Sequence, residues 1–241
     1  MERQDAKTLP AGSAELYSAY VGPPEQYDFM GATQFRLACA LGLREDHHLL
    51  DFGCGSLRAG RLFISYLLAD RYCGVEPNTW LVEQAIAGEL GGEDLIRIKR
   101  PRFDNNDQFR AGMFGTTFDF IVAQSVFSHC GADLIASALN NFRAVLKRDG
   151  VIMATFVPNT KQAEYTGNGW IYPGCVAYSD ETIQRFADNA RLACTKVPWF
   201  HPRQDWYLLA HDARRLPSPE EAAQHLTGKV LWDKRLQERE V

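Results

Sequence analysis

The chain has 241 residues, 46% of them hydrophobic and 23% charged, with a formal net charge of −4. This balance predicts a globular protein whose core needs no metal or disulfide for folding, and the acidic charge argues against a dedicated nucleic-acid-binding protein. No apolar stretch is long enough to span a membrane, and residues 1–10 lack the apolar core of a secretory signal. The sequence contains no C-x-x-C pair, so a zinc ribbon is not expected. We therefore expect a cytoplasmic protein with reduced thiols.

The first half of the sequence alternates between short apolar runs and helical patterns. Residues 1–30 are predicted to be loop, because the paired prolines Pro23 and Pro24 stop a helix there. The expected elements that follow are helix 32–42, strand 47–52, helix 58–69, strand 72–76 and helix 79–87. Alternation of this kind implies right-handed crossovers and a parallel sheet.

The second half continues the alternation and ends differently. The expected elements are strand 117–123, helix 133–146, a turn at 147–150, strand 151–156, a helix from its cap Ser179 to about 191, and strands 193–200 and 205–211. The turn between the last two strands is too short for a crossover, so they pair antiparallel. We predict an α/β fold with a seven-stranded, mostly parallel sheet, an antiparallel C-terminal hairpin and helices on both faces.

A glycine loop lies between strand 47–52 and helix 58–69. Gly53 and Gly55 let the backbone approach a ligand closely, and the N-terminus of the following helix favours a negative group. Glu76 ends the next strand, where a carboxylate can accept hydrogen bonds from both hydroxyls of a ribose. Together these features predict a nucleotide-type cofactor site.

Several segments carry recognisable motifs. Residues 49–56 have the sequence LLDFGCGS, residues 74–78 GVEPN, residues 118–129 FDFIVAQSVFSH and residues 146–151 LKRDGV. With the terminal hairpin, they resemble the motifs of class I, Rossmann-like S-adenosylmethionine-dependent methyltransferases over about residues 45–211. The resemblance implies S-adenosylmethionine as the cofactor. The implied cofactor contacts are Asp51, Gly53, Cys54, Gly55, Ser56, Arg58, Glu76, Pro77, Phe103, Asp104, Gln124 and Ser125.

Two departures from the family pattern matter. Leu57 stands where the family often has a third glycine, and this narrows the approach of the loop to the cofactor; the usual prolyl turn is replaced by Arg148-Asp149. The NAD fingerprint G-x-G-x-x-G would need glycine where Arg58 stands, so the sequence favours S-adenosylmethionine over NAD. Arg36 and Arg58 are both candidates to pair with the cofactor carboxylate.

The resemblance leaves alternatives at several residues. Phe103 and Asp104 either flank the adenine or belong to a surface loop, and Gln124 and Ser125 either face the cofactor or form a satisfied polar strand end.

His129 follows strand 117–123 at the sheet edge where ligands bind, and an imidazole titrates near neutral pH. We predict it to be the catalytic base, with a turn cap or a substrate contact as the alternatives. No H-x-x-H or carboxylate pair suggests a metal site.

The same resemblance suggests three parts: a lid or substrate segment (1–44), the S-adenosylmethionine-binding domain (45–211) and a charged, helical tail (212–241). Seven aromatic residues either form a lid over the substrate or simply cover the core. They are Tyr17, Tyr20, Tyr27, Phe29, Trp170, Tyr172 and Tyr178. In the tail, the apolar side chains either dock on the domain or form a homodimer contact, and these are Leu226, Val230, Leu231 and Trp232.

The predicted function is methyl transfer to a small-molecule acceptor, at a hydroxyl oxygen. One alternative is nitrogen methylation of a protein, peptide or RNA, but the N/D-P-P-Y/F sequence common in such enzymes is absent from residues 124–127. Another is a non-catalytic scaffold with the same fold, against which the intact Asp51, Gly53, Gly55 and Glu76 argue. A NAD-dependent oxidoreductase is the third.

Overall fold

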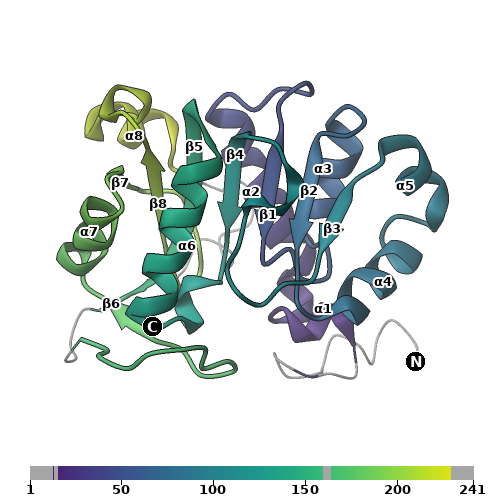
Figure 1. The fold of residues 1–241 in the computed structure, drawn as a ribbon, viewed down its shortest axis with the longest axis horizontal. Helices are drawn as coiled ribbons and strands as arrows, with labels where there is room; N and C mark the ends of the chain where they lie inside the picture. The colour runs from purple at the N-terminus through teal and green to yellow at the C-terminus, as the bar shows by residue number, and fades with distance from the viewer. Residues whose placement is uncertain (1–12, 14–15, 160–163, 229–241) are drawn as a thin grey trace. The chain divides into compact units, whose positions relative to one another are not determined.

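We describe a computed structural model of the chain, which covers Ser13, residues 16–159 and residues 164–228 (Figure 1). The chain forms two compact units, which meet in the sequence between Asp107 and Gln108. The boundary lies inside the part of the sequence that resembles the methyltransferases, so each unit is described by itself.

The first unit becomes helical earlier in the chain than predicted, although the helix expected at 32–42 is present as most of α2. Helix α1 spans Tyr17–Tyr20, a 3₁₀ turn η2 spans Pro24–Gln26, and helix α2 spans Tyr27–Ala40. The prediction of a loop up to residue 30 was therefore wrong. The reason is that Pro24 occupies the first position of η2, where its missing N–H is not needed and its fixed φ suits a helix start.

Three parallel strands form the sheet of the first unit, in the order β3-β2-β1. They are β1 (Leu49–Phe52), β2 (Tyr72–Val75) and β3 (Arg102–Asp104), and the helices between them are α3 (Gly60–Tyr66), α4 (Thr79–Gly88) and α5 (Glu93–Lys99). The strands β1 and β2 are buried along their whole length. Helix α5 and strand β3 were missed because each is too short for a periodic pattern to stand out.

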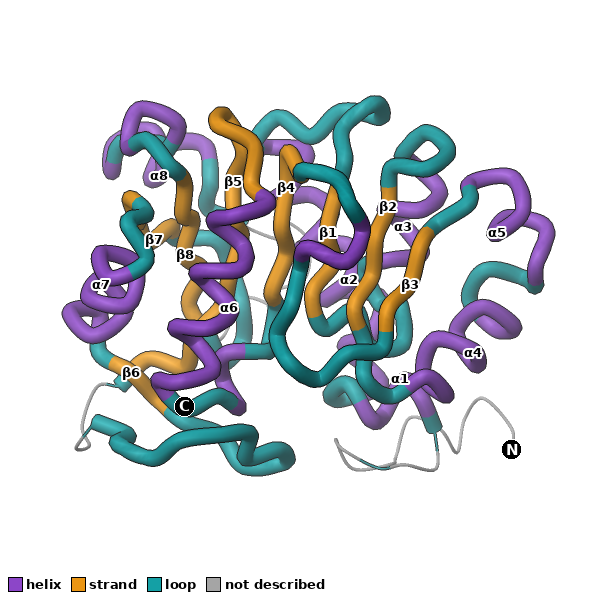
Figure 2. Tube along the Cα trace, viewed as in Figure 1, coloured by secondary structure: helices purple, strands orange, loops and turns teal. Residues whose placement is uncertain are grey.

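The second unit has the strand order β4-β5-β8-β7, with β6 beside β5. Its strands are β4 (Phe118–Ala123), β5 (Leu146–Pro158), β6 (Ala177–Tyr178), β7 (Ala193–Val197) and β8 (Asp205–Ala210). Strand β8 runs antiparallel to both β5 and β7. The helices are α6 (Ala132–Val145), α7 (Asp180–Asn189) and α8 (Pro219–His225), with 3₁₀ turns η3 (Gly112–Phe114), η4 (Phe127–His129) and η5 (Ala213–Arg215). Figure 2 shows α6 covering one face of these strands.

Three local predictions can be compared with this unit. Ser179 caps α7 as expected, since its side chain accepts a hydrogen bond from the Thr182 N–H. The predicted turn at 147–150 is instead the start of β5, which pairs with β4 across an irregularity between Phe118 and Phe120. Within the tail, α8 carries a capping box between Ser218 and Glu221, and Leu226 is buried.

The fold class was predicted correctly: it is mixed α/β, mostly parallel, with antiparallel C-terminal strands. Eight strands are described where seven were expected, because β6 has only two residues. The homodimer contact stays a prediction, and Val230, Leu231 and Trp232 lie outside the described residues. None of the described helices is long and apolar enough to cross a membrane, and all six cysteines are free thiols.

Candidate active site

The glycine loop leaves the end of β1 and is fixed to the end of β2. The backbone N–H groups of Gly53 and Cys54 both donate to the Val75 carbonyl, at 2.8 and 3.0 Å. Gly53 and Gly55 have φ of +74° and +53°, a region that glycine enters without strain. At Gly55 a side chain would also collide, because a Cβ there would lie 2.8 Å from Cγ1 of Val21. The loop therefore requires glycine at position 55 for two separate reasons.

Glu76 follows β2 and turns its carboxylate onto the glycine loop. One oxygen, Oε2, accepts the N–H of Gly55 at 3.0 Å, while Oε1 accepts both the backbone and the side-chain N–H of Asn78 at 2.9 Å. The side chain is only 8% exposed, and burial raises its pKa although these hydrogen bonds lower it. A carboxylate has about four acceptor positions, so within the described residues Oε2 keeps one for a ligand.

Asp51 is a buried acid at the end of β1. Its Oδ2 accepts the Tyr72 hydroxyl at 2.8 Å, and the residue is 5% exposed. Burial raises the pKa of Asp51 to about 7, against the Tyr72 hydrogen bond and the charge of Arg58, which lower it. Gly60 makes room for the Tyr72 hydroxyl, because a Cβ there would lie 2.6 Å from it.

Leu57 and Arg58 follow the glycine loop and differ in their surroundings. Leu57 adopts a φ of +56°, so a fully buried leucine holds a conformation that usually belongs to glycine. Arg58 turns away into the N-terminal segment, where its Nη1 donates to the Val21 carbonyl at 2.9 Å. Arg36, the other candidate partner for a cofactor carboxylate, is exposed on α2.

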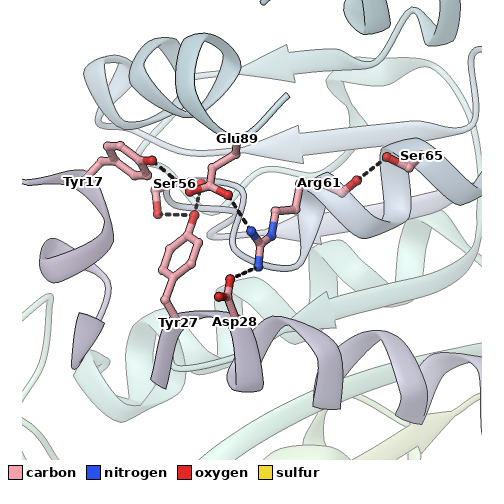
Figure 3. Close-up of polar contacts among 7 residues, drawn as sticks. All are labelled: Tyr17, Tyr27, Asp28, Ser56, Arg61, Ser65 and Glu89. Atoms are coloured by element: carbon pink, nitrogen blue, oxygen red, sulfur yellow. Dashed lines mark hydrogen bonds and ion pairs between the residues drawn. The ribbon is translucent and has the colours of Figure 1, made fainter. Parts of the chain in front are cut away.

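A tyrosine of α2 supports the glycine loop from below. The Tyr27 hydroxyl donates to the Ser56 carbonyl at 2.6 Å, and the Ser56 hydroxyl donates back to it at 3.2 Å. Figure 3 shows Tyr27 reaching from its helix to the loop. Tyr27 and Ser56 are both buried, and burial raises the tyrosine's pKa above the usual range. The sequence left lid and core cover open for Tyr27 and did not predict this support.

A second set of contacts ties the N-terminal helices to α3 and α4. Arg61 of α3 forms ion pairs with Asp28 of α2 and with Glu89, which follows α4. Glu89 also accepts the Tyr17 hydroxyl at 2.8 Å, as Figure 3 shows. Tyr20 packs edge-on against Trp80 with ring centroids 5.4 Å apart. The N-terminal segment is thus fastened at several points around the loop.

Phe103 and Asp104 lie on β3 and not in a surface loop. Phe103 packs edge-on against Tyr72, with ring centroids 6.0 Å apart, and Gly74 leaves space for it, since a Cβ there would lie 2.9 Å from the ring. Asp104 accepts the backbone and side-chain N–H of Asn106 at 2.9 and 2.6 Å. Its own carbonyl accepts the Glu76 N–H. Pro77, which follows Glu76, is exposed.

In the second unit, Gln124 and Ser125 belong to a buried polar cluster after β4. Ser125 has a φ of +58°, its N–H donates to Thr155 Oγ1 at 2.8 Å, and its hydroxyl accepts the Gln204 amide at 2.9 Å. The amide of Gln124 lies 3.1 Å from Nε2 of His201. The cluster joins residues that are far apart in the sequence, so the sequence could not predict it.

His201 is held in one tautomer. Its Nδ1 accepts the backbone N–H groups of Arg203 and Gln204, at 3.1 and 2.9 Å. The proton of the neutral ring is therefore on Nε2, and the part of the Gln124 amide that faces it is an acceptor. Since the turn is tightly bonded and Trp206 at the start of β8 is fully buried, residues 201–204 form a packed hairpin turn.

His129 ends η4 and is half-buried. Its Nδ1 lies 2.6 Å from the Gly174 carbonyl, and because a carbonyl only accepts, Nδ1 carries the proton. Burial lowers the pKa of His129, although the hydrogen bond to Gly174 opposes this. The neutral ring then presents an unprotonated Nε2, which is the arrangement that a general base requires. The rings of Trp170 and Tyr172 lie at 5.4 and 4.9 Å from the imidazole.

The described residues contain no group of three or more His, Cys, Asp or Glu side chains that could hold a metal ion. They do contain the parts of a nucleotide-type site: a glycine loop after β1, an acid after β2 and a mostly parallel α/β fold. These features define the class of Rossmann-like proteins that bind a nucleoside cofactor.

Comparison with known proteins specifies the class further. Residues 50–152 match the family described as methyltransferase domain. Over these residues the chain is similar to that family, and this resemblance implies S-adenosylmethionine as the cofactor. The residues present fit this cofactor, because two glycines with positive φ and the open acceptor position of Glu76 lie at the same loop. No curated protein matches the sequence.

Solved structures share the fold at low identity. The magnesium protoporphyrin IX methyltransferase of Synechocystis PCC 6803 with bound SAH is 13% identical, with a TM-score of 0.58 over 78% of this chain and 87% of that one. An S-adenosylmethionine-dependent methyltransferase of Clostridium acetobutylicum is 15% identical, with a TM-score of 0.56 over 76% and 92%. The glycopeptide N-methyltransferase MtfA is 11% identical, with a TM-score of 0.59 over 76% and 90%. These likenesses concern the fold and leave the acceptor open.

Proposed function

We propose that the protein transfers the methyl group of S-adenosylmethionine to a hydroxyl oxygen of a small molecule, with His129 as the general base. The observation that carries this proposal is the hydrogen bond from His129 Nδ1 to the Gly174 carbonyl, which leaves Nε2 as an acceptor. In the proposal, the segment 1–44 covers the cofactor loop, residues 45–211 perform the reaction and residues 212–241 form a tail.

We assign the cofactor contacts as follows. Glu76 accepts a ribose hydroxyl at the open position of Oε2, and accepts a second one only if the Asn78 side chain gives up its bond to Oε1. The loop from Gly53 to Ser56 holds the methionine half. Arg58 stays a proposed cofactor contact through its remaining donors, while its Nη1 bonds the Val21 carbonyl of the N-terminal segment. The remaining predicted contacts stay part of the proposal: Asp51, Pro77, Phe103, Asp104, Gln124 and Ser125.

When bound, the cofactor supplies a methyl group attached to a positively charged sulfur. Once the methyl group has been transferred, that sulfur is a neutral thioether. His129 lowers the barrier by removing the acceptor proton. As the new carbon–oxygen bond forms, the hydroxyl proton passes to Nε2, and Nδ1 keeps its bond to the Gly174 carbonyl and so stabilises the imidazolium. General-base catalysis of this kind contributes about 10²- to 10⁴-fold.

One substitution tests the base. His129→Asn keeps a side-chain N–H near the position of Nδ1, so it preserves the bond to Gly174, but it has no group at the position of Nε2. We expect methylation of hydroxyl acceptors to fall about 10²-fold or more, with affinity for S-adenosylhomocysteine unchanged within about twofold. In the unsubstituted protein, kcat/KM should fall with decreasing pH only below the usual imidazole value of 6.5, because the pKa of His129 is lowered.

The measurement is release of S-adenosylhomocysteine with paired acceptors that differ only in the acceptor atom, alcohols and phenols against the matching amines. Turnover with hydroxyl members supports the proposal. Turnover with amines alone would replace it with nitrogen methylation, and undiminished turnover in His129→Asn would remove the base. Failure to bind S-adenosylhomocysteine at all would favour a scaffold.

A further inference from the structure

Three aromatic side chains of the second unit gather around the proposed base. The rings of Trp170 and Tyr172 flank His129, and their planes are inclined by only 18° with centroids 6.3 Å apart. Phe109 packs against Trp170 with ring centroids 6.3 Å apart. We call Phe109, His129, Trp170 and Tyr172 the aromatic wall.

Trp170 is the most exposed part of the wall. Its side chain is 52% exposed, and it is the only aromatic residue among the large exposed hydrophobic residues of the described chain. Single exposed apolar side chains are common on protein surfaces, so exposure alone does not define a site. What sets Trp170 apart is how firmly its backbone is held.

The backbone on both sides of Trp170 is bonded to the segment that carries His129. Ile171 N–H donates to the His129 carbonyl at 3.0 Å, and Gly131 N–H donates to the Gly169 carbonyl at 2.9 Å. Gly131 permits this approach, because a Cβ there would lie 2.6 Å from Asn168 Cα. The backbone that carries the exposed indole is thereby fixed relative to the segment of His129 before any ligand binds, and such preorganisation lowers the entropic cost of binding.

The backbone near the wall is also strained. Phe109 has a φ of +57°, which costs a bulky residue conformational energy and persists only where the surroundings enforce it. Strain of this kind gathers at ligand sites. Here it coincides with the contact between Phe109 and the exposed indole, so it marks the wall independently of exposure.

The geometry of the wall distinguishes a flat ligand from a cation. Trp170 and Tyr172 present nearly parallel faces, against which a planar ring stacks. A cation would gain most from a carboxylate within the wall, but the side chains that make up the wall are all aromatic. A neutral aromatic ring therefore suits the wall better.

We propose that the acceptor is a planar aromatic compound with a ring hydroxyl, which stacks on Trp170 and Tyr172 and presents its hydroxyl to Nε2 of His129. This inference rests on the proposed function and names the substrate class for it. A phenol is also the hydroxyl that an imidazole deprotonates most easily, since its pKa is about 10, as in tyrosine. In the reaction the phenolic proton passes to Nε2, the oxygen bonds to the methyl carbon, and the carbon–sulfur electron pair stays on sulfur.

The test measures binding and requires no methyl transfer. NMR titrations with S-adenosylhomocysteine present compare 2-naphthol with decahydro-2-naphthol, which has the same skeleton and hydroxyl but no aromatic face. We expect 2-naphthol to bind about 3- to 10-fold more tightly. Trp170→Leu should bring the two ligands within about twofold of each other, while Trp170→Phe should keep most of the preference. Ile98→Ala, at an exposed hydrophobic residue of the other unit, is the matched control and should change neither affinity.

Two results would overturn the proposal: equal binding of both naphthols to the unsubstituted protein, or tighter binding of tetramethylammonium than of 2-naphthol. A preference for 2-naphthol that survives in Trp170→Leu would also show that the wall does not bind the aromatic ring. These failures are distinct from failure of the proposed function. An enzyme that methylates alcohols but ignores the aromatic face refutes only the wall, and an enzyme that binds 2-naphthol but methylates only amines refutes only the hydroxyl acceptor.

Discussion

Asp51, at the end of β1 beside the glycine loop, makes the stability of the protein depend on pH. Its carboxyl is buried and has a pKa of about 7, compared with 3.8 for an unperturbed aspartate. The native state therefore holds a proton that the unfolded chain has already released at pH 5 or 6. Because the native state binds more protons in this window, the free energy of unfolding falls as pH rises from about 4 to about 7.

Asp51→Asn should remove most of this dependence. The amide oxygen can still accept the Tyr72 hydroxyl, but it carries no charge to desolvate. We expect the unsubstituted protein to lose about 2–3 kcal/mol of stability between about pH 5 and about pH 8 that the variant retains. Urea unfolding at each pH measures the difference.

A residual slope should remain in the Asn variant, because burial also raises the pKa of Glu76. Parallel pH curves for the two proteins would show that Asp51 titrates in the native state as it does in the unfolded chain. Glu45 is exposed, so Glu45→Gln, which removes a carboxylate from the surface, is the control.

At the scale of elements, the N-terminal helices and the glycine loop behave as one assembly. Tyr27 of α2 closes a reciprocal pair of hydrogen bonds with Ser56, and Val21 fills the space above Gly55. Arg61 joins α3 to α2 and to the end of α4. The loop that we assign to the cofactor is therefore shaped by residues that precede it by about 30 positions in the sequence.

Tyr27→Phe tests this coupling. The ring stays in place, but the buried Ser56 carbonyl loses its donor, which costs about 1–3 kcal/mol. We expect this loss of stability in urea unfolding, together with weaker binding of S-adenosylhomocysteine in a calorimetric titration. Tyr17→Phe, which removes a partly buried bond to Glu89, is the matched control and should cost about 1 kcal/mol or less. Unchanged affinity in Tyr27→Phe would separate α2 from the cofactor loop.

The same elements show what the sequence could and could not predict. Strands β1 and β2 and the hairpin β7–β8 have strong apolar patterns, and Gly53, Gly55 and Glu76 follow such strands directly, so both fold class and loop were predicted. Short elements such as α1, α5 and β6 carry too few residues for a period to appear. The partners of the site residues were missed for another reason: the contact from Gln124 to His201 spans 77 positions, and only the tertiary fold brings such residues together.

At the scale of the whole molecule, the fold and the acceptor are separate questions. Solved structures with the same fold include a magnesium protoporphyrin IX methyltransferase and a glycopeptide N-methyltransferase, at 13% and 11% identity. One fold thus serves acceptors of different chemistry, as is usual when function resides in sites built on a common scaffold. The acceptor of this chain must therefore be argued from its own residues, such as His129 and Trp170.

Cofactor binding should therefore be visible in the stability of the whole chain, whatever the acceptor is. A ligand that binds only the native state at 100 times its Kd stabilises it by about 2.7 kcal/mol. For a protein of this size each kcal/mol shifts Tm by about 2–4 °C, so S-adenosylhomocysteine should raise Tm by about 5–10 °C.

Glu76→Gln replaces an acceptor oxygen with a donor beside Gly55, and at the same ligand concentration a tenfold weaker Kd would about halve the shift in Tm. NADH at equal concentration is the control and should leave Tm unchanged, because Arg58 stands where its fingerprint requires glycine. A shift with NADH and none with S-adenosylhomocysteine would assign the loop to the dinucleotide, and an undiminished shift in Glu76→Gln would show that its carboxylate does not bind the ribose.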